Sequence, residues 1–229
     1  MIKAIIFDKD GTLLEFSDIW YKGIIKLLDS LNLKESDYNK LKFEIGIDKN
    51  SKIRENSILA SGSIKDLADC IDKYSHIPVL EKDIEDIFIE IIKENPEKVK
   101  QTCDLRTLFT YLIDNKIKII VSTSDNLKVA EKMFDILGII TQIDYLISAD
   151  CFPAKPNPSS IEFIKDKFKL ENEQILMVGD SRVDMEYGIL VKASVGVLCG
   201  TGSEEMLSQY ADIIVENPLE LIDILYKFD

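Results

Sequence analysis

Basic residues are scarce in this chain, and the shortage excludes two kinds of partner. The 229 residues include 28 lysines and arginines against 41 aspartates and glutamates, which gives a formal net charge of -13 at pH 7. A nucleic-acid or anionic membrane surface would need a stripe of lysine and arginine, and none stands out. We therefore expect no nucleic-acid partner and no membrane partner, so an anionic ligand must be held by a local arrangement.

Cysteine is also rare, and its spacing argues against a cysteine-based metal site. The chain has four cysteines, far apart from one another: Cys70, Cys103, Cys151 and Cys199. This spacing favours reduced thiols, with disulfides as the alternative.

No apolar run approaches a membrane span, and the sequence begins on a strand pattern without a basic leader. We expect a cytoplasmic protein, either a monomer or a homodimer.

From residue 105 onward the sequence alternates between helical patterns and short apolar runs. Apolar runs typical of buried strands occur there at 117–121, 143–147, 175–178, 195–198 and 213–215, and a further run of this kind occurs at the start of the sequence, at 2–7. Apolar residues at helical spacing occur at 105–113, 129–137, 159–168, 183–192 and 218–227. A repeated strand and helix pattern predicts an α/β fold with a parallel sheet covered by helices on both faces.

The stretch between the first two strands has a helical pattern throughout instead of alternating strand and helix patterns. Its apolar residues follow helical spacing over 24–31, 64–71 and 84–91, and no convincing strand run interrupts them. Asn95-Pro96 marks a return to the sheet. We therefore expect an α/β core domain made of residues 1–14 and 101–229, with an all-helical domain of residues 15–100 inserted into it.

Polar residues follow four of the expected strands at their carboxyl ends, where ligands bind in open α/β sheets. These residues are Asp8 and Asp10 after the first strand, Ser122 to Asp125 after the second, Lys155 after the third, and Asp180 and Asp184 after the fourth. Each signal alone is typical of a turn or a helix cap. Together they predict one acidic cluster with a hydroxyl and an ammonium group at a single edge of the sheet.

An acidic cluster of this kind indicates a metal ion. Convergent carboxylates in a crevice are costly unless a cation neutralises them, and oxygen ligands with water are the preference of Mg²⁺. A cation also allows an anionic nucleophile to approach an anionic phosphoryl group. The sequence therefore predicts a Mg²⁺ site and phosphoryl chemistry at this edge.

The same residues resemble, in order, the four motifs of the haloacid dehalogenase-like hydrolase superfamily. They are Asp8-x-Asp10-Gly11-Thr12, Thr123, Lys155 and Gly179-Asp180-x-x-x-Asp184. The position of the helical insert is similar to the cap of the phosphoglycolate-phosphatase-like branch. The resemblance implies a Rossmann-like, doubly wound core with a mobile cap. It also implies Mg²⁺-dependent hydrolysis of a small phosphomonoester through an aspartyl-phosphate.

The resemblance also implies a role for each charged residue. Asp8 would be the nucleophile, and Asp10 would protonate the leaving group and then activate water. Lys155 would supply positive charge to the nucleophile and the phosphoryl group. Asp180 would bind Mg²⁺ with Asp8 and the backbone carbonyl of Asp10, and Asp184 would assist it.

The phosphoryl-binding residues are implied less sharply. Thr123 is preferred for the contact with phosphoryl oxygens, and Ser122 is its rival because it stands directly before it. Ser124, Gly11 and Thr12 complete the expected substrate-binding set in the core, and Gly11 permits the sharp chain reversal after the first strand.

Specificity is expected to come from the helical insert, where the sequence is less informative. Trp20 is a candidate wall of the substrate pocket, although a single tryptophan among apolar neighbours is more often a core residue. Arg54 and the serine-rich loop up to Ser63 are candidates for a substrate-facing loop, because Ser63 is typical of a helix N-cap and helix N-termini attract anions. The alternative is an ordinary capped turn.

Other functions of the same superfamily remain open. A sugar-phosphate mutase usually has a cap histidine soon after the first motif, whereas the only histidine here is His76. A phosphonate hydrolase would need a cap lysine, for which Lys22 and Lys49 are candidates. A phospho-accepting receiver domain shares the acidic cluster, but the chain length and the helical insert count against it. The substrate itself is left open.

Overall fold

The computed structural model describes residues 1–229 except 17, 51–52, 55–56, 76 and 229. The chain forms two compact units. Unit 1 consists of Met1–Phe16, Lys100–Thr123 and Leu137–Asp229, and unit 2 of Ser17–Val99 and Ser124–Ile136. The second segment of unit 2 was expected in the α/β core, and its packing places it with the helical insert instead.

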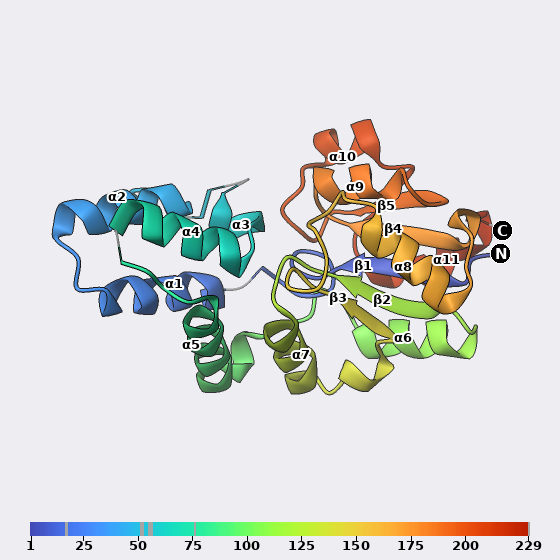
Figure 1. Cartoon of the computed structure of the whole chain (residues 1–229). Coiled ribbons are helices and arrows are strands. Elements are labelled where there is room, and N and C mark those ends of the chain that lie inside the picture. The colour runs from blue at the N-terminus through green and yellow to red at the C-terminus, as the bar shows by residue number, and fades with distance from the viewer. Residues whose placement is uncertain (17, 51–52, 55–56, 76, 229) are drawn as a thin grey trace. The chain divides into compact units, whose positions relative to one another are not determined.

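Unit 1 is built on a parallel sheet of six strands in the order β3-β2-β1-β4-β5-β6 (Figure 1). The strands are β1 (Ala4–Asp8), β2 (Lys118–Ser122), β3 (Tyr145–Ile147), β4 (Ile175–Gly179), β5 (Ala193–Val197) and β6 (Ile213–Val215). Each lies within or close to an apolar run, because strands buried on both faces need apolar residues at every position. The expected α/β fold with a parallel sheet is confirmed.

The helices of unit 1 follow the expected alternation with two differences. They are α6 (Leu105–Asp114), α8 (Ser159–Phe168), α9 (Arg182–Gly188), α10 (Glu204–Tyr210) and α11 (Leu221–Ile224). Short 3-10 turns are η2 (Ile140–Gln142), η3 (Asn172–Gln174), η4 (Pro218–Glu220) and η5 (Leu225–Phe228). Helix α9 is shorter than expected, since it ends at Gly188. A Cβ atom at Gly188 would collide with Ser194. Helix α10 was not predicted.

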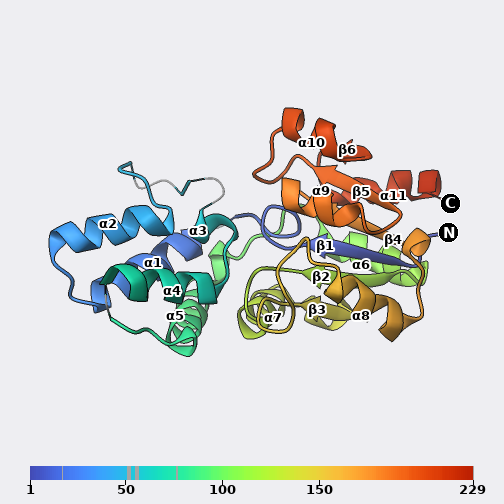
Figure 2. The same ribbon diagram turned by 45° about the horizontal axis from the view of Figure 1, so that its top comes forward.

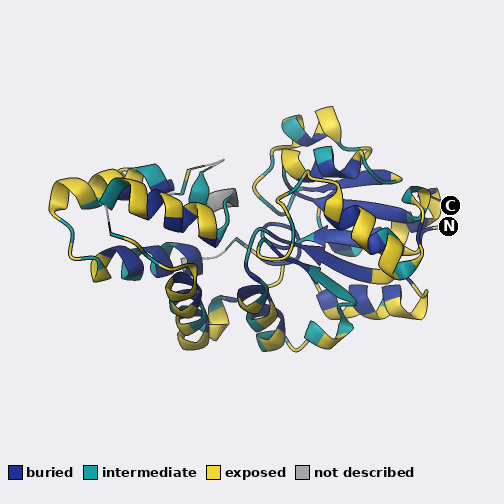
Figure 3. Ribbon diagram, in the orientation of Figure 1, coloured by how far each residue is buried: buried dark blue, intermediate teal, exposed yellow. Residues whose placement is uncertain are grey.

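The two faces of the sheet can be distinguished by residue number. Ile6 belongs to an apolar cluster with Ile164 of α8 and Tyr187 of α9. Phe7 instead contacts Phe109 of α6, with ring centroids 6.1 Å apart. The central strands β1, β2, β4 and β5 are almost entirely buried (Figure 3). Because side chains alternate along a strand, even-numbered residues of β1 point to the side of α8 and α9.

Unit 2 is helical, as the spacing of its apolar residues predicts (Figure 2). Its helices are α1 (Asp18–Ser30), α2 (Glu35–Ile45), α3 (Ile58–Ser61), α4 (Ile64–Ser75), α5 (Glu81–Glu94) and α7 (Leu127–Ile136), with the turn η1 (Pro96–Lys98). Helix α2 was not predicted, because it is polar and buries only Leu41 and Ile45. Helix α7 packs against α5.

Candidate active site

The chain reverses sharply after β1 and brings the first motif into the site. The amides of Leu13 and Leu14 both donate to the carbonyl of Lys9, at 3.0 and 2.8 Å. Gly11 adopts φ 86° at the reversal, and a Cβ atom there would collide with the carboxylate of Asp180. Only glycine fits both the backbone angle and this close approach.

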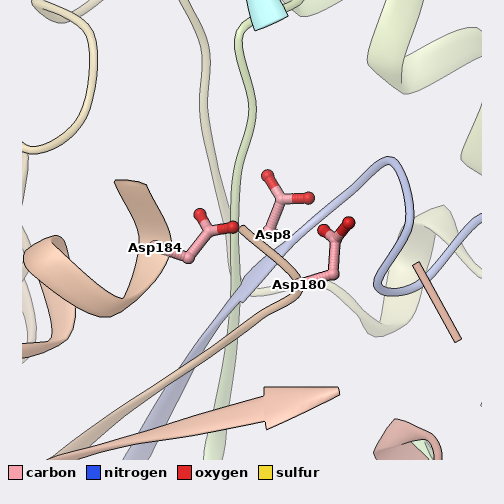
Figure 4. Close-up of side chains that lie close together, drawn as sticks. All are labelled: Asp8, Asp180 and Asp184. Atoms are coloured by element: carbon pink, nitrogen blue, oxygen red, sulfur yellow. The ribbon is translucent and has the colours of Figure 1, made fainter. Parts of the chain in front are cut away.

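Three carboxylates meet at the carboxyl end of the sheet. Asp8 ends β1, Asp180 directly follows β4, and Asp184 lies on α9; one oxygen of each lies within 4.8 Å of the others (Figure 4). Asp180 and Asp184 are 2% and 1% exposed, so solvent screens them little. The cluster predicted from the strand ends is therefore present within unit 1.

Lys155 ties two of these carboxylates together. Its Nζ donates to Asp8 Oδ1 and to Asp184 Oδ1, both at 2.6 Å, and to the carbonyl of Ser122 at 3.2 Å. These three bonds use all the hydrogens of an ammonium group. Burial lowers the pKa of Lys155, but Asp184 and Asp8 outweigh it and raise the pKa above its usual value, so the ammonium stays charged.

The charges of this cluster do not balance. Three carboxylates and one ammonium leave two negative charges in a nearly dry site. Burial, with Asp184 and Asp180 nearby, raises the pKa of Asp8 well above its usual value despite Lys155. Burial and Asp184 likewise raise the pKa of Asp180. Carboxylate oxygens with two uncompensated charges fit a divalent cation, so the cluster can hold a metal ion.

Asp180 is held by groups from two other loops. The hydroxyl of Thr12 donates to Asp180 Oδ1 at 3.2 Å, and the amide and hydroxyl of Thr201 donate to Oδ2 at 2.7 and 2.9 Å. Thr12 is fully buried, so its hydroxyl serves Asp180 rather than the substrate for which it was proposed. Thr201 was missed, although it follows β5 at the same edge of the sheet, where the strand-end rule would have found it.

Asp184 is held by the start of its own helix. Ser181 is the N-cap of α9 and forms a capping box with Asp184: its hydroxyl donates to Asp184 Oδ2 at 2.6 Å and accepts from the Asp184 amide at 3.3 Å. The sequence offered this cap as the ordinary reading of the motif. The structure shows the cap and the cluster together, because the second oxygen of Asp184 faces Lys155.

Asp10 stands apart from the three clustered carboxylates. Its Oδ2 pairs with Lys9, whose side chain is 0% exposed. Its Oδ1 is buried and has no hydrogen-bond partner among the described residues. Lys9 was not predicted as a partner of Asp10, although it stands between the two aspartates. Asp10 is thus fixed through Oδ2, whereas its Oδ1 is buried without such a bond among the described residues.

The register of β1 and β2 bears on the choice between Ser122 and Thr123. Asp8 pairs with Ser122, so their side chains point to the same face of the sheet. The amide of Thr123 donates to the carbonyl of Ile147 at 2.9 Å, one step beyond this pair. The sequence preferred Thr123, whereas the register favours Ser122. Ser124 begins the second segment of unit 2.

Comparison with known proteins identifies the family. The model of the haloacid dehalogenase-like hydrolases matches residues 2–190. This chain belongs to that family. A Clostridium perfringens protein that bears the name pyrophosphatase PpaX is 26% identical to this hydrolase over 238 residues, which cover 100% of both chains. A phosphoglycolate phosphatase from Aquifex aeolicus is 23% identical over 230 residues, which cover 98% of this chain and 97% of the relative.

Solved structures show the same fold. The crystal structure of a predicted phosphoglycolate phosphatase from Haemophilus somnus 129pt matches this hydrolase with a TM-score of 0.71 and 22% identity, over 98% of each chain. The implied haloacid dehalogenase-like core is therefore confirmed as a fold. In the part of the hydrolase that the structure describes, no helix has the length and apolarity required to cross a bilayer.

The candidates in unit 2 of the hydrolase have structural partners of their own. Trp20 is 6% exposed and meets Phe88 edge-to-face at 4.9 Å, which makes it a core residue of this unit. Arg54 is exposed, donates to the carbonyl of Phe43 and lies over the Phe43 ring at 4.1 Å. Ser63 accepts from the Asp66 amide at 3.1 Å, so it caps α4 as predicted.

Two further candidates from the sequence concern the alternative chemistries. His76, the residue weighed for a mutase, lies outside the described residues. Lys22, weighed for a phosphonate hydrolase, donates to the side chain of Asn95 at 2.8 Å. This bond gives Lys22 a structural partner within unit 2, and Lys49 lies in an exposed turn.

Proposed function

We propose that this hydrolase is a Mg²⁺-dependent phosphatase of small phosphomonoesters that works through an aspartyl-phosphate on Asp8. The observation that carries the proposal is the unbalanced cluster: Asp8, Asp180 and Asp184 lie close together, and Lys155 compensates only one of their three charges. Such a cluster destabilises a fold unless a bound cation compensates its charge, so its presence indicates a functional site.

The reaction divides into two displacements. A carboxylate oxygen of Asp8 attacks phosphorus, the bond to the ester oxygen breaks, and Asp10 gives its proton to the departing alkoxide, which leaves as the alcohol. Asp10 then takes a proton from water as the water oxygen attacks phosphorus. The bond to Asp8 breaks, and inorganic phosphate leaves. The buried Oδ1 of Asp10, which has no hydrogen-bond partner among the described residues, is the atom that supports both proton transfers.

Positive charge must cancel the repulsion between Asp8 and the phosphoryl group. Lys155 supplies one charge, held at 2.6 Å from Asp8. Mg²⁺ held by Asp8 and Asp180, with Asp184 beside them and the Asp10 carbonyl as the expected fourth oxygen, would supply the remainder. We propose Ser122 as the hydroxyl that donates to the phosphoryl oxygens, with Thr123 as the rival, because Ser122 is in register with Asp8.

The names of the relatives support the proposed substrate class. Two of the sequence relatives bear the names of a pyrophosphatase and a phosphoglycolate phosphatase. We infer that phosphoglycolate is the first substrate to test. The helical insert as a specificity cap, the cytoplasmic location and the monomeric or homodimeric state remain predictions.

Phosphate release from a panel of esters tests the proposal. The purified chain is assayed with Mg²⁺ on phosphoglycolate, pyrophosphate, sugar phosphates and nucleotides, beside the Asp8→Asn variant as the matched control. Release that depends on both Mg²⁺ and Asp8 is the expected result. Release that is equal for the two proteins on every compound would contradict the proposal.

A further inference from the structure

A tyrosine hydroxyl lies buried directly behind the site. Tyr187 belongs to α9, three residues after Asp184, and is 0% exposed. Its hydroxyl forms a hydrogen bond with the hydroxyl of Ser160 on α8, which is 1% exposed. The side chain of Ser122, at the end of β2, also interacts with this hydroxyl and acts to lower the pKa of the phenol. Three elements of unit 1 therefore meet at one phenolic oxygen.

The hydroxyls of Tyr187 and Ser160 lie in a part of the core that is otherwise apolar. Tyr187 packs into the cluster formed by apolar residues of the sheet and α8, among them Ile6, Ile164 and Met177. A buried hydroxyl costs free energy unless it is paired, and a phenylalanine would fill nearly the same volume without that cost. Packing alone therefore explains the ring of Tyr187 and leaves its hydroxyl, and that of Ser160, without a reason.

The partner of Tyr187 connects this pair to the reacting groups. Ser122 is in register with Asp8, and its carbonyl accepts a hydrogen bond from Lys155 Nζ at 3.2 Å. Burial raises the pKa of Tyr187 above its usual value, so the phenol keeps its proton and can donate. If Ser160 donates to Tyr187 and Tyr187 donates to Ser122, the hydrogen of Ser122 is left to donate elsewhere.

We propose that Tyr187 is a positioning residue, which with Ser160 orients the hydroxyl of Ser122 toward the phosphoryl oxygens of the substrate. The inference rests on the proposed phosphatase function and adds to it a relay that runs from Ser160 through Tyr187 to Ser122. Each hydroxyl polarises the next, so the terminal donor is stronger and more narrowly aimed than an isolated serine.

A double-mutant cycle on kcat/KM tests the relay. Tyr187→Phe keeps the ring and removes only the hydroxyl, and we expect kcat/KM on phosphate esters to fall about five- to tenfold, the effect of one hydrogen bond. Ser160→Ala should lower kcat/KM in the same direction by less. In the Ser122→Ala background, Tyr187→Phe should cause no further loss, because the relay then has no terminus.

The controls separate positioning from stability. Tyr226→Phe removes an exposed hydroxyl far from the site in sequence and should leave kcat/KM unchanged, and Tm is measured for every variant. A Tyr187→Phe protein with lower Tm and wild-type kcat/KM overturns the inference. The inference is also overturned if Tyr187→Phe lowers kcat/KM by the same factor in the Ser122→Ala background as in the wild type. A wild-type chain that releases no phosphate overturns the proposed function itself, and the inference with it.

Discussion

The two compact units bury charge in opposite ways. In unit 1 the buried carboxylates Asp180 and Asp184 gather around Asp8 and Lys155, and this cluster keeps an excess of negative charge, whereas the buried Lys9 pairs with Asp10. In unit 2 the buried charge found among the described residues is Glu85 of α5. Its carboxylate accepts from Lys128 of α7 at 2.8 Å and from Asn126 at 3.4 Å, so it is balanced.

The charge of Glu85 stabilises the structure of unit 2, whereas the charges of the cluster in unit 1 are suited to binding a ligand. A balanced buried pair joins two elements and needs nothing further. An unbalanced cluster lowers the stability of the empty protein, and natural proteins keep such strain where function requires it. Neutralising a carboxylate should therefore raise stability and abolish activity in unit 1, and lower stability with little effect on activity in unit 2.

The largest effect is expected at the nucleophile. Asp8→Asn removes the attacking carboxylate, so phosphate release should fall more than about a thousandfold and no phosphoenzyme should form. Asp10→Asn should instead slow both the formation and the breakdown of the phosphoenzyme. Rapid-quench measurements distinguish the two variants. Near-normal turnover by Asp8→Asn would show that the covalent step is wrongly assigned.

Metal removal should have the next largest effect. Chelation should abolish phosphate release and Mg²⁺ should restore it, because the cluster then regains its missing positive charge. Ca²⁺ should compete with Mg²⁺ and inhibit, since it accepts bidentate carboxylates and can occupy both oxygens of Asp8. Steady-state release at fixed Mg²⁺ with increasing Ca²⁺ measures this. Full activity in chelator, or in Ca²⁺ alone, contradicts the assignment.

Neutralising one carboxylate of the cluster should reverse the usual cost of a core substitution. Asp180→Asn should raise the unfolding free energy of the chain in chelator by about 1–2 kcal/mol, because it removes an uncompensated buried charge, while activity is lost. Added Mg²⁺ should raise the Tm of the wild type more than that of the variant. Thermal unfolding with and without Mg²⁺ measures both, and a variant less stable than the wild type in chelator counts against the charge argument.

The matched substitution in unit 2 should behave in the opposite sense. Glu85→Gln breaks a balanced pair, so the unfolding free energy should fall by about 1–3 kcal/mol while kcat stays within about twofold of the wild type. Chemical denaturation and steady-state kinetics on the same preparation measure the two quantities. A large loss of kcat without loss of stability would remove the contrast between the units.

The smallest effect is expected at Arg54, an exposed residue of unit 2. If the helical insert selects substrates, Arg54→Ala should change the relative kcat/KM among phosphate esters by about two- to fivefold. The exposed Arg106 of α6 provides a control, since Arg106→Ala should change none of them. An equal change on every ester would exclude a role for Arg54 in specificity.

The strands and the acidic cluster were predictable for physical reasons. Strands buried on both faces need apolar residues at every position, so β1 and β4 stand out as runs. The carboxyl ends of parallel strands share one edge, which predicts that Asp8 and Asp180 lie along it, and the pairing of β1 with β4 brings them together. Helix α2 was missed because its polar sequence leaves only a weak apolar pattern.

Other features depend on register and packing that apolar spacing does not contain. The preference for Ser122 over Thr123 requires the pairing of Asp8 with Ser122. The partners of Tyr187 come from α8 and β2, far apart in the sequence. The placement of α7 with unit 2 depends on its contact with α5, whereas its apolar spacing resembles that of any helix beside a sheet.

The most direct test of the central claim is to locate the phosphoryl group on the protein. The chain is mixed with phosphoglycolate and Mg²⁺, quenched in acid within the first turnover, digested and analysed by mass spectrometry. The account predicts one phosphoryl group per chain, on the peptide that contains Asp8, and none after Asp8→Asn. Phosphate release without this adduct, or an adduct on a different residue, would contradict it.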